Sequence, residues 1–252
     1  MLLTKDDMKQ FLDEGYFVLE RAIPGPDLAG LRLECQQSLD THVALMERVG
    51  AETLGLTHKE KRYTLPCWHE ERPFLQRFLF GNVMMEIVRS TVGDNAYLFL
   101  ELFSLKWPRT GTALEWHQDS GYLLGIPHKP YISLWCALDD MTEENGCLYV
   151  LPYSRAESKD VVQHIKDKKT NDLIGYSGTD LGTALLVPAG SIVGFSSTTF
   201  HRSGANLSDQ PRRAFLASYS SEPITDKKGN LWNLAVPFIE NGARVIDSDA
   251  LD

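Results

Sequence analysis

The length and composition of the chain describe an ordinary globular protein. Its 252 residues suffice for one large domain or two small ones. With 43% hydrophobic and 23% charged residues, the composition excludes disordered, collagen-like and low-complexity classes. The net charge is −9, and no basic stripe typical of nucleic-acid binders is visible. No apolar run approaches the ~18 residues that a membrane span needs. We therefore expect no nucleic acid and no membrane among its partners.

The cysteines and the N-terminus bear on the cellular compartment. Cys35, Cys67, Cys136 and Cys147 form no CxxC pair and no zinc-ligand spacing. A chain this long buries enough surface to fold without cross-links, so we expect buried thiols rather than disulfides. The start, MLLTKDDMKQ, lacks the basic head and apolar core of a signal peptide. We expect a cytoplasmic protein.

The first 95 residues are predicted to be mostly helical. Thr4 and Asp7 resemble a capping box that begins a helix ending at Gly15, and a strand over 16–23 follows. Pro24 and Pro26 open the next helix, whose apolar residues form one stripe. The pattern predicts a third helix from about Pro73 to Arg89, whereas the polar stretch 52–68 is ambiguous.

After residue 96 the sequence becomes rich in short β-branched and aromatic runs bounded by Gly, Pro and Asn. This pattern predicts a β sandwich or barrel, and the runs are too closely spaced for crossover helices. The stretch 153–180 reads as a long surface loop and a candidate lid. No repeat or linker divides the chain, so we expect a single domain over 1–252: a helical part over about 1–95 and a β core over about 96–220. The predicted strands are 96–107, 113–119, 131–138, 147–152, 183–187, 191–197 and 213–220.

The residues with the clearest chemical potential are His117 and Asp119 in the run Trp-His-Gln-Asp. On a strand, residues i and i+2 point to the same face, so an imidazole and a carboxylate would lie side by side. A divalent metal can bind both. Alone, the triplet is weak evidence, because a histidine bonded to a nearby Asp gives the same pattern.

Two later residues support a metal site. His201 follows the predicted strand 191–197 and would supply a third ligand from another strand. Two histidines and one carboxylate on one face of an octahedron define the non-haem Fe(II) oxygenase site, with three positions left open. Arg212 stands at the head of the next strand. Its guanidinium can bind a carboxylate with two hydrogen bonds, which suits the far end of a dicarboxylic keto acid that chelates the metal.

These four residues together resemble the phytanoyl-CoA dioxygenase family of Fe(II)/2-oxoglutarate-dependent oxygenases. The run DDMTEENGC over 139–147 is similar to the family's D-D-x-T-x-E-N-G turn, and residues 1–23 are similar to its opening helix and strand. Trp135 and Ser203 also match positions that lie near 2-oxoglutarate in the family. The resemblance covers about 1–220, most densely 100–220.

The resemblance implies a mainly β fold with flanking helices around a double-stranded β-helix, the jelly-roll or cupin-like core. It implies that Fe(II) is bound by His117, Asp119 and His201, with no catalytic residue beyond these ligands. It also implies that Arg212 binds the C5 carboxylate of 2-oxoglutarate, beside Ser203 and Trp135, and that O2 is the co-substrate.

The sequence departs from the family pattern at a few positions. Gly190-Ser191 replaces a common Gly-Asp pair that includes no ligand. Arg213 is the alternative to Arg212, and only one of them can reach the pocket because strand neighbours face opposite ways. Lys106 and the pair 61–62 are candidates for the family's lysine that assists 2-oxoglutarate. The carboxylate of Asp119 excludes the halogenase variant, in which chloride takes its place.

The resemblance implies hydroxylation of an unactivated C–H with release of succinate and CO2. We expect a small-molecule substrate, an amino-acid derivative or a secondary-metabolite intermediate, because no basic cradle for coenzyme A is visible. Phe103, Trp116 and Tyr149 are candidates for the substrate pocket. The same ligands would also serve desaturation, cyclisation, epimerisation or an acyl-CoA hydroxylase. Outside this class, a non-catalytic or other-metal cupin-like barrel remains open, and the sequence sets no oligomeric state.

The other histidines are interpreted as surface or hydrogen-bonded residues. Cys67 and His69 lack the second ligand pair that a zinc site requires. The histidines in this group are His42, His58, His69, His128 and His164.

Overall fold

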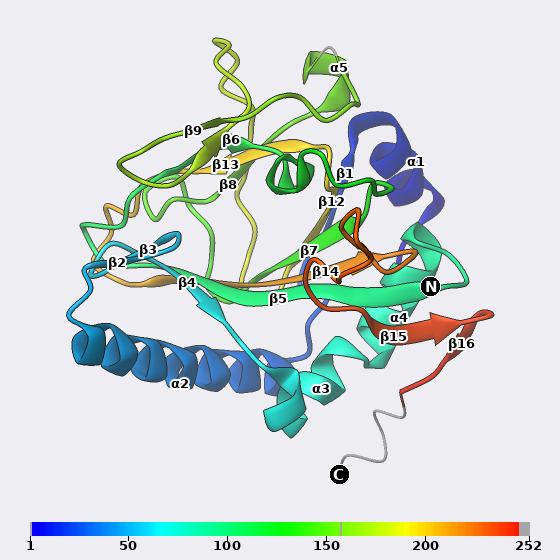
Figure 1. Cartoon of the computed structure of the whole chain (residues 1–252), viewed down its shortest axis with the longest axis horizontal. Helices are drawn as coiled ribbons and strands as arrows, with labels where there is room; N and C mark the ends of the chain where they lie inside the picture. The colour runs from blue at the N-terminus through cyan, green and yellow to red at the C-terminus, as the bar shows by residue number, and fades with distance from the viewer. Residues whose placement is uncertain (1, 157, 247–252) are drawn as a thin grey trace.

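Two antiparallel sheets face each other, and helices cover the outer face of the larger sheet (Figure 1). This arrangement is seen in a computed structural model that describes residues 2–156 and 158–246. Every strand pairing between the described strands is antiparallel, and the expected jelly-roll fold is confirmed. The space between the two sheets holds the site described below.

The larger sheet has ten strands in the described ranges, in the order β1-β12-β7-β14-β5-β4-β3-β2, with β15 on β5 and β16 on β15. Side chains alternate between the helix-covered face and the face toward the smaller sheet. Its strands are β1 (Tyr16–Leu19), β2 (Thr53–Leu54), β3 (Thr57–His58), β4 (Arg62–Pro66), β5 (Ala96–Lys106), β7 (Ile132–Ala137), β12 (Ile192–Ser196), β14 (Arg212–Ser220), β15 (Val236–Glu240) and β16 (Ala243–Arg244).

The smaller sheet has the strand order β11-β8-β13-β6. These strands are β6 (Leu114–His117), β8 (Leu148–Leu151), β11 (Thr183–Leu185) and β13 (Phe200–Ser203). A two-stranded ribbon, β9 (Ile165–Lys166) and β10 (Leu173–Ile174), lies in the segment 153–180, after the short helix α5 (Tyr153–Ala156). The 3-10 helix η2 (Asp119–Leu123) leaves the end of β6 almost directly.

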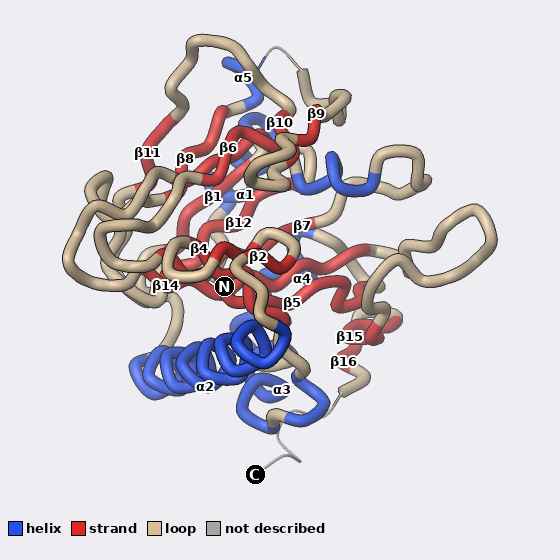
Figure 2. The backbone as a smooth tube through the Cα atoms, turned by 60° about the vertical axis from the view of Figure 1, so that its left-hand side comes forward, coloured by secondary structure: helices blue, strands red, loops and turns tan. Residues whose placement is uncertain are grey.

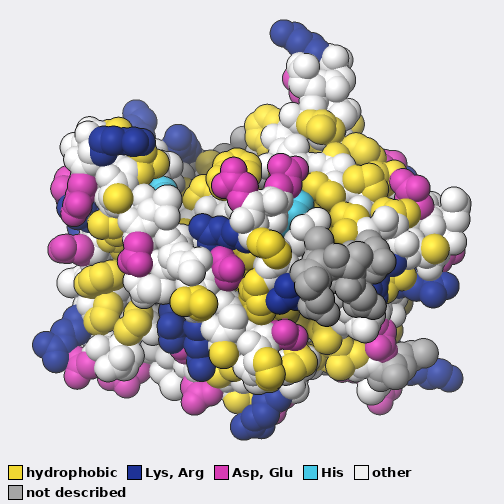
Figure 3. Space-filling model, turned by 90° about the horizontal axis from the view of Figure 1, so that it is seen from below, with side chains coloured by type: hydrophobic (Ala, Val, Ile, Leu, Met, Phe, Trp, Pro, Cys, Tyr) yellow, Lys and Arg dark blue, Asp and Glu magenta, His cyan; other side chains and the backbone are white. Residues whose placement is uncertain are grey.

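The helices pack mainly against the larger sheet. Helix α1 (Lys5–Glu14) begins with the capping box of Thr4 and Asp7 and ends at Gly15, as expected. Helix α2 (Gly25–Val49) follows Pro24, and with α3 (Pro73–Leu79) it lies below the larger sheet in Figures 1 and 2. On the side of the molecule shown in Figure 3, basic and acidic side chains are interspersed. None of the described helices is long and apolar enough to span a membrane.

The expected third helix is wrong in its extent, because it is two helices, α3 and α4 (Asn82–Thr91). The break lies at Phe80 and Gly81. A Cβ at Gly81 would lie 2.6 Å from the carbonyl oxygen of Arg77, so the chain turns at a residue without one. The apolar period runs across the break because both helices bury side chains in the same core.

Two other parts of the chain differ from the sequence expectations. The ambiguous stretch 52–68 forms β2, β3 and β4, which extend the larger sheet beyond β5. The sheet also continues past residue 220, since β15 pairs with β5 at Val236 to Ile239. Neither region shows a long alternating pattern, because β2 and β3 have only two residues each and β15 pairs through a register shift between Pro237 and Ile239.

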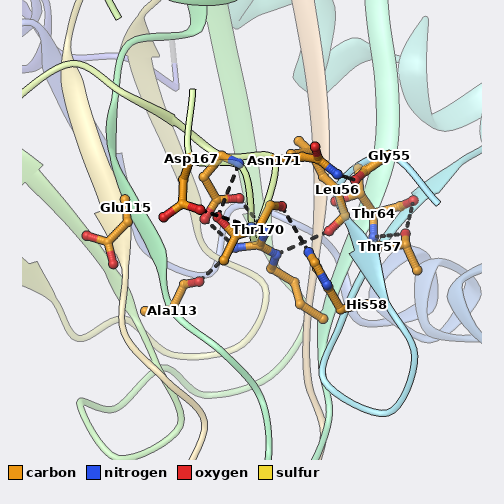
Figure 4. Close-up of polar contacts among 12 residues, drawn as sticks. Gly55, Leu56, Thr57, His58, Thr64, Ala113, Glu115, Asp167, Thr170 and Asn171 are labelled. Carbon is orange, nitrogen blue, oxygen red and sulfur yellow. Dashed lines mark hydrogen bonds and ion pairs between the residues drawn. The ribbon is translucent and has the colours of Figure 1, made fainter. Parts of the chain in front are cut away.

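The segment 153–180 is packed onto the rest of the fold rather than free on the surface. Figure 4 shows part of the polar network: the side chain of Asn171 donates to the Gly55 carbonyl, and Nε2 of His58 lies 2.9 Å from the Thr170 carbonyl oxygen. Beside them, Arg62 and Asp172 form an ion pair whose side chains are 3% and 1% exposed. This network holds the segment against β2, β3 and β4.

The buried apolar side chains form clusters that include the predicted apolar stripe of helix α2. The main apolar cluster lies between the larger sheet and helices α2, α3 and α4, and a second cluster lies between the two sheets. All four cysteines are buried free thiols, as expected. Burial raises the pKa of the Cys35 thiol to about 12, which makes it unreactive.

Candidate metal centre and its cavity

His117 and His201 come from neighbouring strands of the smaller sheet. They are register partners across β6 and β13, and their ring centroids lie 4.1 Å apart. Antiparallel partners point to the same side of a sheet, which here is the side facing the larger sheet. Both side chains are buried, with 4% and 6% of each residue exposed.

Asp119 completes the group but does not belong to the strand. Strand β6 ends at His117, and Asp119 is the first residue of the 3-10 helix η2. Its Oδ1 lies 3.5 Å from Nε2 of His201 and 4.0 Å from Nε2 of His117. In the described residues these three are the only group of His, Cys, Asp or Glu side chains arranged to hold a metal ion. The sequence analysis correctly predicted that His117 and Asp119 lie side by side. Its reason was partly wrong, because Asp119 belongs to η2 and not to the strand.

The outward nitrogen of each histidine is fixed by the backbone. Nδ1 of His117 donates to the Glu115 carbonyl at 2.7 Å, and Nδ1 of His201 donates to the Thr199 carbonyl at 3.1 Å. Each bond places the proton on Nδ1, so each Nε2 presents a lone pair toward Asp119. Burial, with a contribution from His201, holds the pKa of His117 well below its usual value. The neutral form, which metals bind, is thus the stable one.

Sequence reasoning missed the residues that orient Asp119. Ser133 donates to Oδ2 of Asp119 at 2.5 Å, which leaves Oδ1 facing the histidines. Ser133 lies on β7 directly opposite Ser218 on β14, and their hydroxyls are 3.0 Å apart. The only sequence signal is the predicted strand 131–138, whose alternation points Ser133 and Trp135 to one face.

A second support lies in the turn after β6. The backbone N–H of Gln118 donates to Nε2 of His164 at 3.0 Å, and the Gln118 side chain donates to the carbonyls of Asp160 and Thr198. Gly121 packs on the same imidazole, where a Cβ would lie 2.3 Å from the ring. The segment 153–180 therefore reaches the backbone that carries Asp119.

The three residues line one wall of a cavity of about 270 Å³ between the two sheets. Arg212 also lines this cavity and is 1% exposed. Burial lowers the pKa of Arg212 to about 10, and the Nε and Nη1 atoms of its guanidinium have no hydrogen-bond partner in the protein. Such unpaired buried donors are costly unless a ligand satisfies them.

Trp135 and Ser203 lie in the same cavity as Arg212. Both line the cavity, and the guanidinium carbon of Arg212 is 5.8 Å from the centre of the Trp135 ring. Arg213 faces the other way, as strand alternation predicts, and its guanidinium binds Asp139. Of the two arginines, Arg212 is the one in the cavity.

The lysine candidates are engaged elsewhere. Lys106 is fully buried, and its Nζ donates to the backbone carbonyls of Ser203 and Gly204. It is the register partner of Arg212 on β14 and Arg62 on β4, so it anchors the turn after β13 beside the cavity. Arg62 binds Asp172, and Lys61 is exposed. Neither Lys61 nor Arg62 is among the cavity-lining residues.

The three expected substrate-pocket residues lie outside the cavity, which corrects that expectation. Phe103 is in the core on the helix-covered face of β5, packed against Phe215. Trp116 and Tyr149 point to the outer face of the smaller sheet, where Arg202 lies over both rings. Strand neighbours point to opposite faces. Ser104, His117 and Leu148 line the cavity, so their respective neighbours Phe103, Trp116 and Tyr149 point away from it.

The donor set fits both groups that the sequence resemblance implies. Two imidazole Nε2 atoms and one carboxylate oxygen converge on one point, the ligand set of a non-haem iron site with open positions. The unpaired guanidinium of Arg212 in the same cavity fits the distal carboxylate of a chelating dicarboxylic acid.

Comparisons with known proteins agree with this geometry. The model of the phytanoyl-CoA dioxygenase (PhyH) family matches residues 11–214. A phytanoyl-CoA dioxygenase domain-containing protein 1 of Danio rerio is 25% identical over 258 residues, covering 85% of this chain and 89% of that protein. An L-proline trans-4-hydroxylase of Streptomyces griseoviridis is 28% identical over 231 residues, covering 82% of each.

A solved structure shows the same fold. EvdO2 from Micromonospora carbonacea var. aurantiaca, complexed with 2-oxoglutarate, superimposes with a TM-score of 0.66 at 22% identity, covering 97% of this chain and 94% of that one. The family match spans most of the chain, including all the residues of the centre. The chain therefore belongs to the phytanoyl-CoA dioxygenase family of Fe(II)/2-oxoglutarate-dependent oxygenases.

Proposed function

We propose that this protein hydroxylates an unactivated C–H bond of a small molecule and converts 2-oxoglutarate to succinate and CO2. The observation that supports this most directly is the meeting of two elements in one cavity. One is the set of His117, Asp119 and His201, and the other is the unpaired guanidinium of Arg212. Bound Fe(II) with 2-oxoglutarate would supply the oxidising chemistry from O2.

The residues of the chain have distinct roles in this proposal. His117, Asp119 and His201 bind the metal through the atoms that face one another. Arg212 binds the C5 carboxylate of 2-oxoglutarate, with Ser203 as a further hydrogen-bond partner and Trp135 as an apolar wall. The carboxylate of Asp119 occupies the position that a halide would need, so hydroxylation is favoured over halogenation.

The walls of the cavity contribute by excluding water. Most of the lining side chains are aliphatic or aromatic, so competing hydrolysis and loss of oxidising equivalents are restricted. The volume of about 270 Å³ suits a small molecule rather than an extended chain inside the cavity.

The test is turnover of a panel of small molecules with purified protein, Fe(II), ascorbate and 2-oxoglutarate. We expect succinate in proportion to product, and a product that gains the mass of one oxygen atom. A product that loses two hydrogens, or keeps its mass with inverted stereochemistry, would replace hydroxylation by desaturation, cyclisation or epimerisation. Turnover of acyl-CoA thioesters alone would overturn the small-molecule assignment. No 2-oxoglutarate consumption with any substrate would overturn the proposed activity.

A further inference from the structure

Much of the cavity that contains the metal-binding residues is lined by apolar side chains. Phe99, Leu100 and Leu102 line it from β5, and Leu123 and Tyr131 line it from η2 and the start of β7. Phe99 and Tyr131 pack against each other with ring centroids 5.0 Å apart. Apolar groups gain free energy by leaving water for such a surface, whereas a charge loses it unless it is paired.

Among the described residues that line this cavity, no charged side chain is left for a substrate. Besides the histidines, the charged residues of the lining in the described chain are Asp119, Arg202 and Arg212. The guanidinium of Arg202 lies 3.8 Å from the Tyr149 ring centre on the outer face of the sheet, and it donates to the Leu181 carbonyl. Asp119 and Arg212 are assigned to the metal and 2-oxoglutarate.

The charges of the loaded centre also balance. Fe(II) carries two positive charges and Arg212 one, against one negative charge on Asp119 and two on 2-oxoglutarate. The nearby Arg62 is paired with Asp172, and burial holds the pKa of Lys106 well below its usual value. The cavity would therefore offer a charged substrate group no counter-charge.

Several neutral polar residues remain in the described lining, and Tyr122 and Asn233 are two of them. The buried hydroxyl of Tyr122 has no hydrogen-bond partner in the protein, and its ring packs edge-on against His117. Asn233 lines the cavity from the segment that connects β14 to β15. Both can bind a hydroxyl or carbonyl group, and neither neutralises a charge.

One wall of the cavity comes from a segment beyond the family match, which ends at residue 214. Residues 221–235 connect β14 to β15 and contribute Trp232 and Asn233 to the lining. The segment is anchored because Ile224 packs with Phe99, Leu123 and Tyr131, and the N–H of Trp232 donates to the Ile224 carbonyl at 3.0 Å. Trp232 itself is 50% exposed, so apolar area remains for a ligand to cover.

We infer that the substrate is an uncharged, largely apolar molecule, and that Trp232 and Asn233 determine its recognition. The inference rests on the proposed function and narrows it, because it favours neutral metabolite intermediates over zwitterionic amino-acid derivatives. Coenzyme A thioesters are also disfavoured by the charges of their nucleotide.

The test measures binding rather than turnover. Protein loaded with Fe(II) and saturating 2-oxoglutarate is kept free of oxygen and titrated by calorimetry with matched probes. Each of two skeletons, cyclohexyl and 2-naphthyl, is offered as the methanol, the carboxylate and the methylammonium. We expect the alcohol of at least one skeleton to bind about tenfold or more tightly than both of its charged counterparts, since an unpaired buried charge is disfavoured. Equal or tighter binding of a charged probe, or binding of neither alcohol, overturns the inference.

Variants of the wall test the assigned residues. Trp232→Ala should weaken alcohol binding about tenfold, whereas Trp68→Ala, which removes a tryptophan that is 61% exposed outside the cavity, should leave it unchanged. Asn233→Asp adds a carboxylate to the lining and should shift preference from the alcohol toward the methylammonium probe. If Trp232→Ala has no more effect than Trp68→Ala and Asn233→Asp leaves the preference unchanged, the assignment of these residues is wrong.

The visible metal-to-ligand charge-transfer band of the Fe(II)–2-oxoglutarate complex is recorded in every sample. If the band forms but the alcohol does not bind more tightly than the charged probes, the inference about the substrate is wrong and the proposed function is retained. If the band does not form in the wild type, the proposed function fails, and the inference fails with it.

Discussion

His117 and His201 face each other as register partners on two antiparallel strands, with ring centroids 4.1 Å apart. The two histidines of the centre are therefore positioned by strands of the smaller sheet and not by a loop. The Nδ1–H of each ring donates to a backbone carbonyl two residues earlier in the chain, so the local backbone orients both rings. Asp119 is the one member of the group that needs another element to hold it.

Ser133→Ala tests that support. The substitution removes the hydroxyl that donates to Oδ2 of Asp119 and so lets the carboxylate rotate away from the histidines. We expect metal affinity to fall about 10- to 100-fold, measured by anaerobic titration with Fe(II) or Mn(II). Ser90→Ala is the matched control, since Ser90 bonds only within helix α4. Unchanged affinity in Ser133→Ala would show that η2 alone positions Asp119.

His164 should make the stability of the metal-free protein depend on pH. Its Nδ1–H donates to the Val162 carbonyl, and its Nε2 accepts the Gln118 N–H, so only the neutral ring fits. Burial lowers the pKa of His164 below the usual 6.5. Below pH ~6.5 the unfolded chain binds a proton that the folded chain refuses, so the free energy of unfolding falls as pH falls.

The comparison uses urea unfolding between pH 7.5 and 5.5 with a chelator present. His164→Gln should be less stable at pH 7.5 and should lose less stability on acidification than the wild type. An equal loss of stability in His164→Gln and the wild type would place the pH dependence in other groups.

Asp172→Asn should destabilise the protein strongly. Arg62 and Asp172 are 3% and 1% exposed in their side chains, and the change leaves the guanidinium buried without a counter-charge. Removing one partner of a buried pair costs about 3–5 kcal/mol, which denaturant unfolding would measure. Asp180→Asn breaks the exposed pair with Arg155 and should change the free energy of unfolding little. A similarly small effect of Asp172→Asn would contradict a structural role for the pair.

Sequence patterns predicted the elements with strong periodicity and clear end signals. The capping box at Thr4, the helix after Pro24 and the strand that begins at Arg212 lie as expected, whereas β13, which carries His201, was not among the predicted strands. Alternation along β14 also separates Arg212 from Arg213 correctly. Strands β4 and β15 could not be predicted, because β4 buries adjacent residues and so does not alternate, and β15 pairs with β5 through a register shift.

For the metal centre, the sequence allowed prediction of the metal ligands and Arg212 but not of the residues that support them. His117, Asp119, His201 and Arg212 occur in a recognisable order, but Ser133 and His164 approach Asp119 and its backbone from distant segments. The substrate side was predicted least well, because an aromatic residue on a strand can face either sheet surface. A shift of one position exchanges the cavity for the core, as Phe103 in the core and its neighbours Leu102 and Ser104 in the cavity show.

The most direct test of the central claim is oxygen-free binding of Fe(II) and 2-oxoglutarate, followed by the visible metal-to-ligand charge-transfer band. The wild type should show the band. Asp119→Ala should weaken or shift it, and Arg212→Ala should require about tenfold or more 2-oxoglutarate to reach it, because a charge-assisted bidentate contact is lost. Absence of the band in the wild type at saturating metal and 2-oxoglutarate would contradict the assignment of this site.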